Sequence, residues 1–239
     1  VALCGMSLLF GFAVLTDGYT GVEGQSALYW VVSQVYNSSV LFISPLVAAF
    51  LASRIFPSEI ENGSILLYTS KYRNRGRLYL AKSLALATFT LAAFVVMCLI
   101  NLLTYYLLAV HNPVIASGLL FGENSGMLLL GLFAIYLSSF LIASQLTLVL
   151  GAFFKPTPVI GILFLLTLIS HFTYKIPGLS RLNPWYYIVR VFNDTLSTSA
   201  AVPVDKGIWG IAAAFLLLVA ITVVLANFIG KRKFQSMDL

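Results

Sequence analysis

The residues best suited to recognition chemistry lie in one polar stretch, residues 54–82. Two acids and two small residues come first in it, and three arginines follow: Glu59, Glu61, Gly63, Ser64, Arg73, Arg75 and Arg77. Ser58 and Glu61 have the spacing of a capping box, in which the two side chains satisfy backbone N–H groups at a helix start. The pattern predicts a short helix along the membrane face, loosened by Gly63. Two roles stay open for it, contact with anionic lipid head groups and docking of a cytoplasmic partner.

A second group of polar residues lies inside apolar segments and consists of carboxamides: Gln34, Asn37, Asn101, Gln145 and Asn227. An amide in lipid must find a hydrogen-bond partner, because leaving it unpaired costs free energy. These side chains therefore either bond between helices or line a translocation path, and the sequence leaves both roles open.

Motifs for catalysis or energy supply are absent from the sequence, which has no P-loop, no His-Glu-x-x-His and no Gly-x-Ser-x-Gly. Cys4 and Cys98 both lie in apolar runs and have no metal-ligand spacing. We therefore expect no enzyme activity, no metal and no cofactor in this chain. If the protein pumps a substrate, the energy must come from a partner.

The elements that must position these residues follow from the composition. Hydrophobic residues make up 60% of the 239-residue chain and charged residues only 9%, against about 25% charged in a typical soluble domain. The mean hydropathy is +0.96. This composition excludes an ordinary cytosolic enzyme, a nucleic-acid-binding protein and a disordered chain. We expect an all-α polytopic membrane protein, because backbone groups in lipid must be bonded internally.

Six apolar stretches approach the length of roughly 20 residues that a membrane-spanning helix needs: residues 1–16, 29–53, 83–110, 126–154, 159–174 and 208–229. We interpret them as one transmembrane domain over residues 1–239, and we expect a further segment before Val1. Ten of the 14 basic residues lie on one side of this arrangement. The positive-inside rule places that side, and with it both termini, in the cytoplasm. The five complete spans hold no Asp, Glu, Lys or Arg, which argues against an ion-coupled carrier.

The order of several short motifs resembles the permease of type-2 ABC exporters. These motifs are Glu59-x-Glu61-x-Gly63-Ser64, the basic turn 70–77, Ala81-Lys82 at the start of a span, and Asn183-Pro184 followed by aromatic residues and Arg190. The sequence departs from the family's pattern in the turn, where Lys71-Tyr72-Arg73 replaces the usual proline. The resemblance covers nearly the whole chain.

This resemblance implies a cytoplasmic coupling helix after the second span and an extracellular re-entrant helical hairpin between the last two spans. This chain and a second permease, either another copy or a homologous permease, would pair with two cytoplasmic ABC ATPase subunits, which would bind the ATP and Mg²⁺. The coupling contacts would be made by Glu59, Glu61, Gly63 and Ser64, and the arginines Arg73, Arg75 and Arg77 would orient the loop at the ATPase or lipid surface.

A translocation path between the two copies would be lined by polar and aromatic residues, mainly of the second and fifth spans: Gln34, Asn37, Phe42, Asn101, Gln145, Thr167 and Phe172. A path of this kind suits an amphiphilic or hydrophobic cargo such as a peptide, a lipid or a drug-like molecule. The expected location is the plasma membrane of a bacterium, with membrane lipid and no nucleic acid among the partners. Two other functions stay open, a non-transporting immunity or sensor module that binds a peptide, and a channel or carrier that needs no ATPase.

Overall fold

The structure, a computed structural model, describes most of the chain: residues 25–67, 74–112, 116–122, 125–173, 175–176, 178–189 and 207–236. Within these ranges the chain forms helices joined by turns and contains no β-strand. One isolated backbone bridge joins Gln25 to Ala116. The expected first span, residues 1–16, lies outside the described residues.

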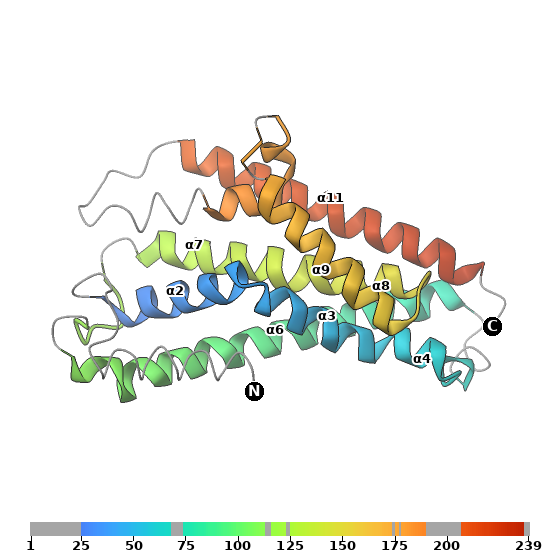
Figure 1. The fold of residues 1–239 in the computed structure, drawn as a ribbon, viewed down its shortest axis with the longest axis horizontal. Coiled ribbons are helices and arrows are strands. Elements are labelled where there is room, and N and C mark those ends of the chain that lie inside the picture. Colours follow the sequence, from blue (N-terminus) through green and yellow to red (C-terminus); the bar gives the residue numbers. More distant parts are fainter. Residues whose placement is uncertain are drawn as a thin grey trace.

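The helices run roughly side by side as an elongated bundle (Figure 1). In chain order they are α2 (Ala27–Val40), α3 (Ile43–Ile55), α4 (Pro57–Glu61), α6 (Arg75–Leu107), α7 (Ser125–Ile135), α8 (Ala143–Gly151), α9 (Pro156–Thr173) and α11 (Gly207–Gln235). Short 3₁₀ turns, η1 (Ala109–His111) and η3 (Ser180–Leu182), and a π-helical segment, η2 (Tyr136–Ile142), complete the order. Residues 184–189 are also helical.

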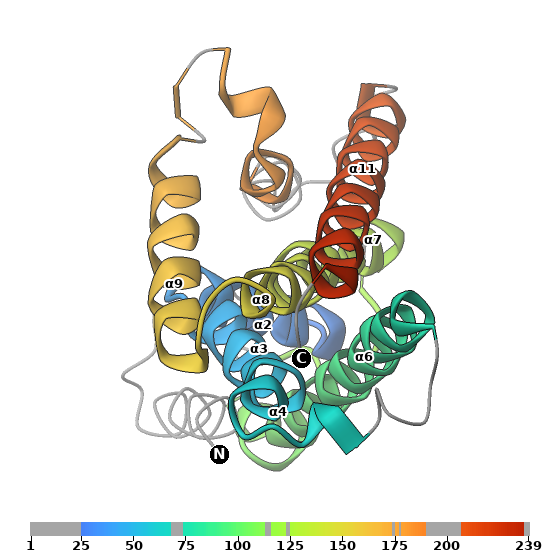
Figure 2. The same ribbon diagram turned by 90° about the vertical axis from the view of Figure 1, so that its right-hand side faces the viewer.

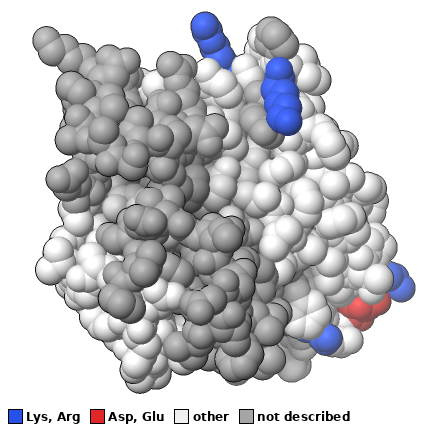
Figure 3. Space-filling model, turned by 60° about the vertical axis from the view of Figure 1, so that its left-hand side comes forward, with Lys and Arg blue, Asp and Glu red and all other residues white. Residues whose placement is uncertain are grey.

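Five helical stretches are long and apolar enough to cross a membrane: Ile43–Glu61, Arg75–His111, Ser125–Gly151, Pro156–Thr173 and Gly210–Gln235. The described part of the chain therefore has the make-up of an all-α membrane protein. A large uncharged surface agrees with this. On the face shown in Figure 3, the described Lys, Arg, Asp and Glu side chains appear only at the margins.

The predicted second span, residues 29–53, is a broken helix in the structure. Phe42 adopts a left-handed conformation with a φ of 61° and separates α2 from α3. Pro45 lacks an N–H and so removes one hydrogen bond that a continuous helix would make. The Ser38 and Ser44 hydroxyls, 2.7 Å apart, bond across the break.

Other predicted boundaries shift in the structure. Helix α6 begins at Arg75, about two turns before the predicted start at residue 83, so that the basic residues up to Lys82 are helical. Helix α11 continues to Gln235 rather than ending at residue 229. Long basic side chains reach from a helix end toward the polar interface, so the helix can continue beyond the apolar run. Of the expected outer hairpin, residues 190–206 lie outside the described residues.

The span made of α7, η2 and α8 lies in the middle of the bundle. In the end-on view, α8 lies among α3, α6, α9 and α11 (Figure 2). Of the 18 most apolar consecutive residues in this span, 61% are buried, whereas the same fraction for α9 is 11%. The π-helical segment η2 occupies the middle of this span, and Ser138 in it donates to the carbonyl of Ala134 over 3.0 Å.

Candidate functional site

Helix α4, the starts of α6 and α9 and the ends of α8 and α11 lie at the same end of the bundle (Figure 1), and many of the described basic residues belong to these segments. We call this region the basic end. Its described basic residues are Arg54, Arg75, Arg77, Lys82, Lys155, Lys231, Arg232 and Lys233. The predicted coupling residues of α4 lie in the same region.

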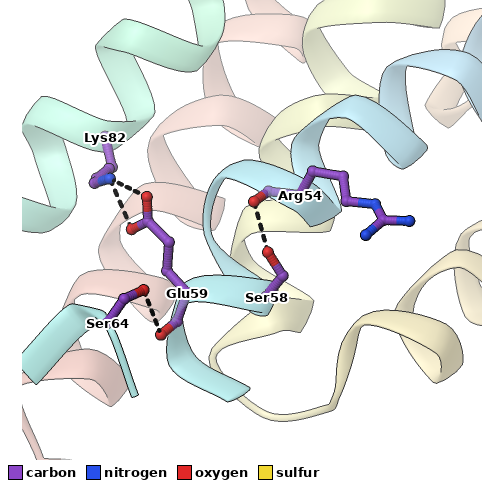
Figure 4. Close-up of polar contacts among 5 residues, drawn as sticks. All are labelled: Arg54, Ser58, Glu59, Ser64 and Lys82. Atoms are coloured by element: carbon purple, nitrogen blue, oxygen red, sulfur yellow. Dashed lines mark hydrogen bonds and ion pairs between the residues drawn. The ribbon is translucent and has the colours of Figure 1, made fainter. Parts of the chain in front are cut away.

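The predicted short helix is present as α4, but its start differs from the expectation. Pro57 is the first helical residue and Phe56 the cap, so the capping box predicted for Ser58 and Glu61 is wrong. A proline is favourable at this position because its missing N–H would have no partner there in any case. The Ser58 hydroxyl instead donates to the carbonyl of Arg54 over 2.6 Å (Figure 4).

Glu59 fastens α4 to the bundle. Both of its carboxylate oxygens lie 2.7 Å from Nζ of Lys82 on α6 (Figure 4). The pair is mostly buried, with 18% of the Lys82 and 22% of the Glu59 side chain exposed. Because water screens such a pair only partly, it holds α4 against α6 more firmly than a surface ion pair would.

The end of α4 is closed by small residues. Gly63 has a φ of 70°, a conformation that glycine adopts readily and that turns the chain out of the helix. The Ser64 hydroxyl donates back to the carbonyl of Glu59 over 3.3 Å (Figure 4). The turn leads to Ile65, which is fully buried. Gly63 therefore ends the helix, whereas the sequence pattern predicted only that Gly63 would loosen it.

A cluster of aromatic rings holds the start of α4 against the bundle. Phe56 packs edge-on against Tyr79 of α6, with ring centroids 5.6 Å apart, and against Phe234 of α11 at 5.5 Å. All three rings are fully buried, and Ile65 belongs to the same cluster. On the other side, a Cβ at Gly151 would lie 2.3 Å from Cγ of Pro57, so α8 approaches α4 as closely as a glycine permits.

The outer face of the same segment is exposed. Among the described residues, Glu61 forms a long 3.7 Å ion pair with Lys155, whose side chain is 78% exposed, and such a pair contributes little stability. Leu66 and Leu67 are 45% and 72% exposed. Glu61 and the two leucines thus form an exposed surface on a segment whose other side is packed against the bundle.

Two of the three predicted arginines lie at the start of α6. Arg75 and Arg77 lie in the first turn of α6, where Asn74 caps the helix by accepting a hydrogen bond from the Arg77 N–H over 3.2 Å. Arg73 lies outside the described residues. The structure therefore places two of the three arginines on the helix that carries Lys82.

The residues predicted for a translocation path do not form one cluster. Thr167 lines a cavity in the middle of the bundle. The ring of Phe42 packs edge-on against that of Phe164 on α9, with ring centroids 6.0 Å apart. Gln34 is buried in α2, Asn37 is half-buried beside it, and Phe172 is 67% exposed.

The other two path residues bond with neighbouring groups. Asn101 donates to the carbonyl of Met97 on its own helix over 2.9 Å. Gln145 joins three helices, since its Oε1 accepts from the Ser83 hydroxyl over 2.7 Å and from the Asn227 amide over 3.2 Å. This arrangement is the interhelical role that the sequence had left open for Gln145 and Asn227.

Several residues of the basic end escaped the prediction of site residues. Lys82 appeared only as part of a motif, and nothing in a single sequence pairs it with Glu59. The rings of Phe56, Tyr79 and Phe234 are apolar residues among many. Only their burial in one cluster distinguishes them.

Comparison with known proteins adds a family and no function. Among the curated proteins and the solved structures, none matches this chain. Over residues 1–239 the chain matches the family DUF2705, described as a protein of unknown function. Since this match extends over the whole sequence, the chain belongs to the DUF2705 family.

Proposed function

We propose that this chain is the transmembrane permease subunit of an ATP-driven exporter, similar to the type-2 ABC permeases, and that it works with a separate cytoplasmic ABC ATPase. The ATPase would bind ATP and Mg²⁺. In this proposal the basic end faces the cytoplasm, because basic residues favour that side of a plasma membrane. Six spans and an outer re-entrant hairpin complete the fold.

The observation that carries the proposal is the way in which α4 is held. The ion pair between Glu59 and Lys82 and the buried Phe56 and Ile65 join it firmly to the bundle, whereas Leu67, six residues after its end, is exposed. An element that is rigid toward the membrane helices and open toward a partner can transmit a movement of that partner. A helix that only rested on lipid would not need this anchoring.

A second permease copy could pack against α9, which is the least buried of the described spans. Helix α9 exposes several large apolar side chains, among them Phe164, Leu165 and Phe172. In the proposal, α9 and the broken helix α2–α3 face the second copy. An amphiphilic or hydrophobic cargo then passes between the copies.

The test is affinity purification of the tagged chain from native membranes in mild detergent. We expect a P-loop ATPase to co-purify. Leu67→Glu places a charge on the exposed surface beside α4 and should lower the recovered ATPase by about tenfold, the loss expected for one contact worth about 1.4 kcal/mol. Leu119→Glu is the matched control, since Leu119 is 62% exposed and lies in the turn that leads away from the opposite end of α6.

The alternatives give different results in the same preparation. Purified chain that holds no ATPase and conducts ions in a bilayer is a channel, and chain that binds peptide without ATP-dependent movement in vesicles is a sensor or immunity module. Either result refutes the permease proposal. ATPase recovery that is equal for Leu67→Glu and wild type refutes the assignment of the docking surface.

A further inference from the structure

A cavity of about 220 Å³ lies in the middle of the bundle. It is lined by parts of α2, α3, η2, α8, α9 and α11 and by the helical residues 184–189. Pockets of this kind, between the helices of a bundle, are common binding sites. The residues important for its chemistry are Ser138, Thr167, Ser170, His171, Trp185 and Thr222.

Two irregular helices meet at this cavity. The break between α2 and α3 contributes Ser39 and Pro45 to the lining, and the π-helical segment η2 contributes Ser138 and Ser139. A π-helical turn and a non-glycine residue in the left-handed region, such as Phe42, both cost conformational energy and both concentrate at functional sites. The helices thus depart from regular geometry where the cavity lies.

Four hydroxyl groups of the cavity lining have already used their protons. Ser138 donates to the carbonyl of Ala134 over 3.0 Å, and Thr167 to that of Leu163 over 2.8 Å. A hydroxyl has one proton to donate and two lone pairs that accept. With the proton committed, Ser138 and Thr167 can offer a ligand only an acceptor.

Two further hydroxyls follow the same pattern. Ser170 donates to Oδ1 of Asn183 over 2.7 Å, and Thr222 to the carbonyl of Leu218 over 2.8 Å. Four acceptor oxygens, supplied by η2, α9 and α11, therefore surround one space. The cavity favours a ligand that carries several N–H or O–H donors.

The described lining carries no carboxylate, lysine or arginine, and its other polar side chains are those of Ser39, Ser139, His171 and Trp185. A charged ligand group would lose its hydration there without a counter-charge. Aromatic rings form one wall. The ring of Trp185 stacks on that of Tyr36, with centroids 5.9 Å apart, and its centroid lies 5.2 Å from that of His171. The indole N–H of Trp185 is buried without a hydrogen-bond partner among the described residues and is a donor. The ligand that fits is therefore uncharged, with an apolar group, several hydrogen-bond donors and an acceptor.

The volume limits the size of the bound group. A cavity of about 150 Å³ is large enough for benzene, and drug-sized ligands occupy about 300–1,000 Å³. At about 220 Å³ the space holds one large apolar side chain with its neighbouring amide groups. An acyl chain of a lipid would fit the apolar walls but has no donor for the four oxygens.

We propose that this cavity binds one large apolar residue of an uncharged peptide, whose main-chain N–H groups donate to the oxygens of Ser138, Thr167 and Ser170. The role of this cavity in transport rests on the proposed function. The cavity proposal adds to that function the class of cargo, an apolar peptide. The binding step itself needs no ATPase. It can therefore be measured on the isolated chain.

The test measures equilibrium binding of radiolabelled N-acetyl-trileucine amide to the purified chain in lipid nanodiscs. The comparison ligand is the same peptide with its amide nitrogens methylated, which keeps the apolar side chains and removes the donors. We expect the methylated peptide to bind at least about tenfold more weakly, because one lost hydrogen bond costs about 3- to 10-fold and several are lost. Equal binding of the two peptides would overturn the proposal.

Matched variants locate the site. Thr167→Val and Ser138→Ala should each weaken peptide binding by about 3- to 10-fold, and Thr167→Ser should restore it. Thr88→Val is the control, because the Thr88 hydroxyl makes the same kind of bond, to the carbonyl of Ala85 over 2.9 Å, on an exposed face of α6. Unchanged binding in both cavity variants would overturn the proposal.

The two proposals fail separately. Peptide binding by a chain that recruits no ATPase upholds the cavity proposal and refutes the export function. Recruitment of an ATPase by a chain that binds no peptide, or that binds only a fatty acid, upholds the export function and refutes the cavity proposal.

Discussion

Nζ of Lys82 on α6 lies 2.7 Å from both carboxylate oxygens of Glu59 on α4, although the two residues are 23 positions apart. The ion pair joins α4 directly to α6. It also fixes the orientation of α4, since the carboxylate can meet the amine only when that side of the short helix faces α6. The same orientation leaves Glu61 on the exposed side.

Breaking the pair should loosen α4. Lys82→Met removes the charge and keeps the length of the side chain, and we expect it to lower the free energy of unfolding by about 1.5–3 kcal/mol, the range for hydrogen bonds to charged groups. Thermal unfolding in detergent measures the change. The exchanged pair, Glu59→Lys with Lys82→Glu, should recover at least half of the loss, and recovery of none would show that the contact contributes nothing by itself.

The approach of α11 to α6 depends on a glycine. A Cβ at Gly230 would lie 1.9 Å from Oη of the fully buried Tyr79, so Gly230→Ala forces the helices apart. We expect a loss of about 1–3 kcal/mol, the usual cost of overpacking. Gly210→Ala on the same helix meets nothing within 4 Å and should gain up to about 1 kcal/mol. Equal midpoints of thermal unfolding for the two variants would contradict this packing.

The polar link between three helices should be cooperative. Gln145 accepts hydrogen bonds from Ser83 and Asn227, so Gln145→Leu and Asn227→Leu remove the same contact. We expect each to cost about 0.6–2 kcal/mol, as for other interhelical bonds in membranes. A double-mutant cycle measures the coupling. Strict additivity of the two changes would exclude the link as an energetic unit.

The helical residues 184–189 should depend on Asn183. Its Oδ1 accepts from the Ser170 hydroxyl over 2.7 Å and from the Trp185 N–H over 2.9 Å, and its Nδ2 donates to Thr173 over 3.0 Å. Asn183→Ala removes these bonds and should cost about 2 kcal/mol, given about 0.5–1.5 kcal/mol for each bond. The emission of Trp185, isolated by replacing the other two tryptophans with phenylalanine, should shift to longer wavelength as the indole becomes wetter.

A matched asparagine tests this reading. Asn62 is exposed at the end of α4, and Asn62→Ala should leave both the emission and the unfolding midpoint unchanged. An unchanged emission in Asn183→Ala would mean that packing against Tyr36 and His171 alone holds the indole of Trp185 in place.

The apolar segments of the sequence were sufficient to predict an all-α membrane protein and the approximate position of five helices. The physical reason is that lipid allows the backbone few solutions, so a long apolar run without charges becomes a helix. The short helix at Pro57–Glu61 was also predictable, because a local run of proline, acid and glycine determines it. Its cap was not, since Ser58 had a choice between two backbone partners and took the carbonyl of Arg54.

Tertiary structure alone decided which of these helices touch and what they enclose. The contact of Glu59 with Lys82, the cluster of Phe56 with Phe234, and the cavity that unites Ser138 with Thr167 all join residues from different helices. One sequence carries no record of such pairings, because apolar faces in lipid are interchangeable until side chains interlock. The break at Phe42 belongs to the same class, since its neighbours on α9 hold the ring in place.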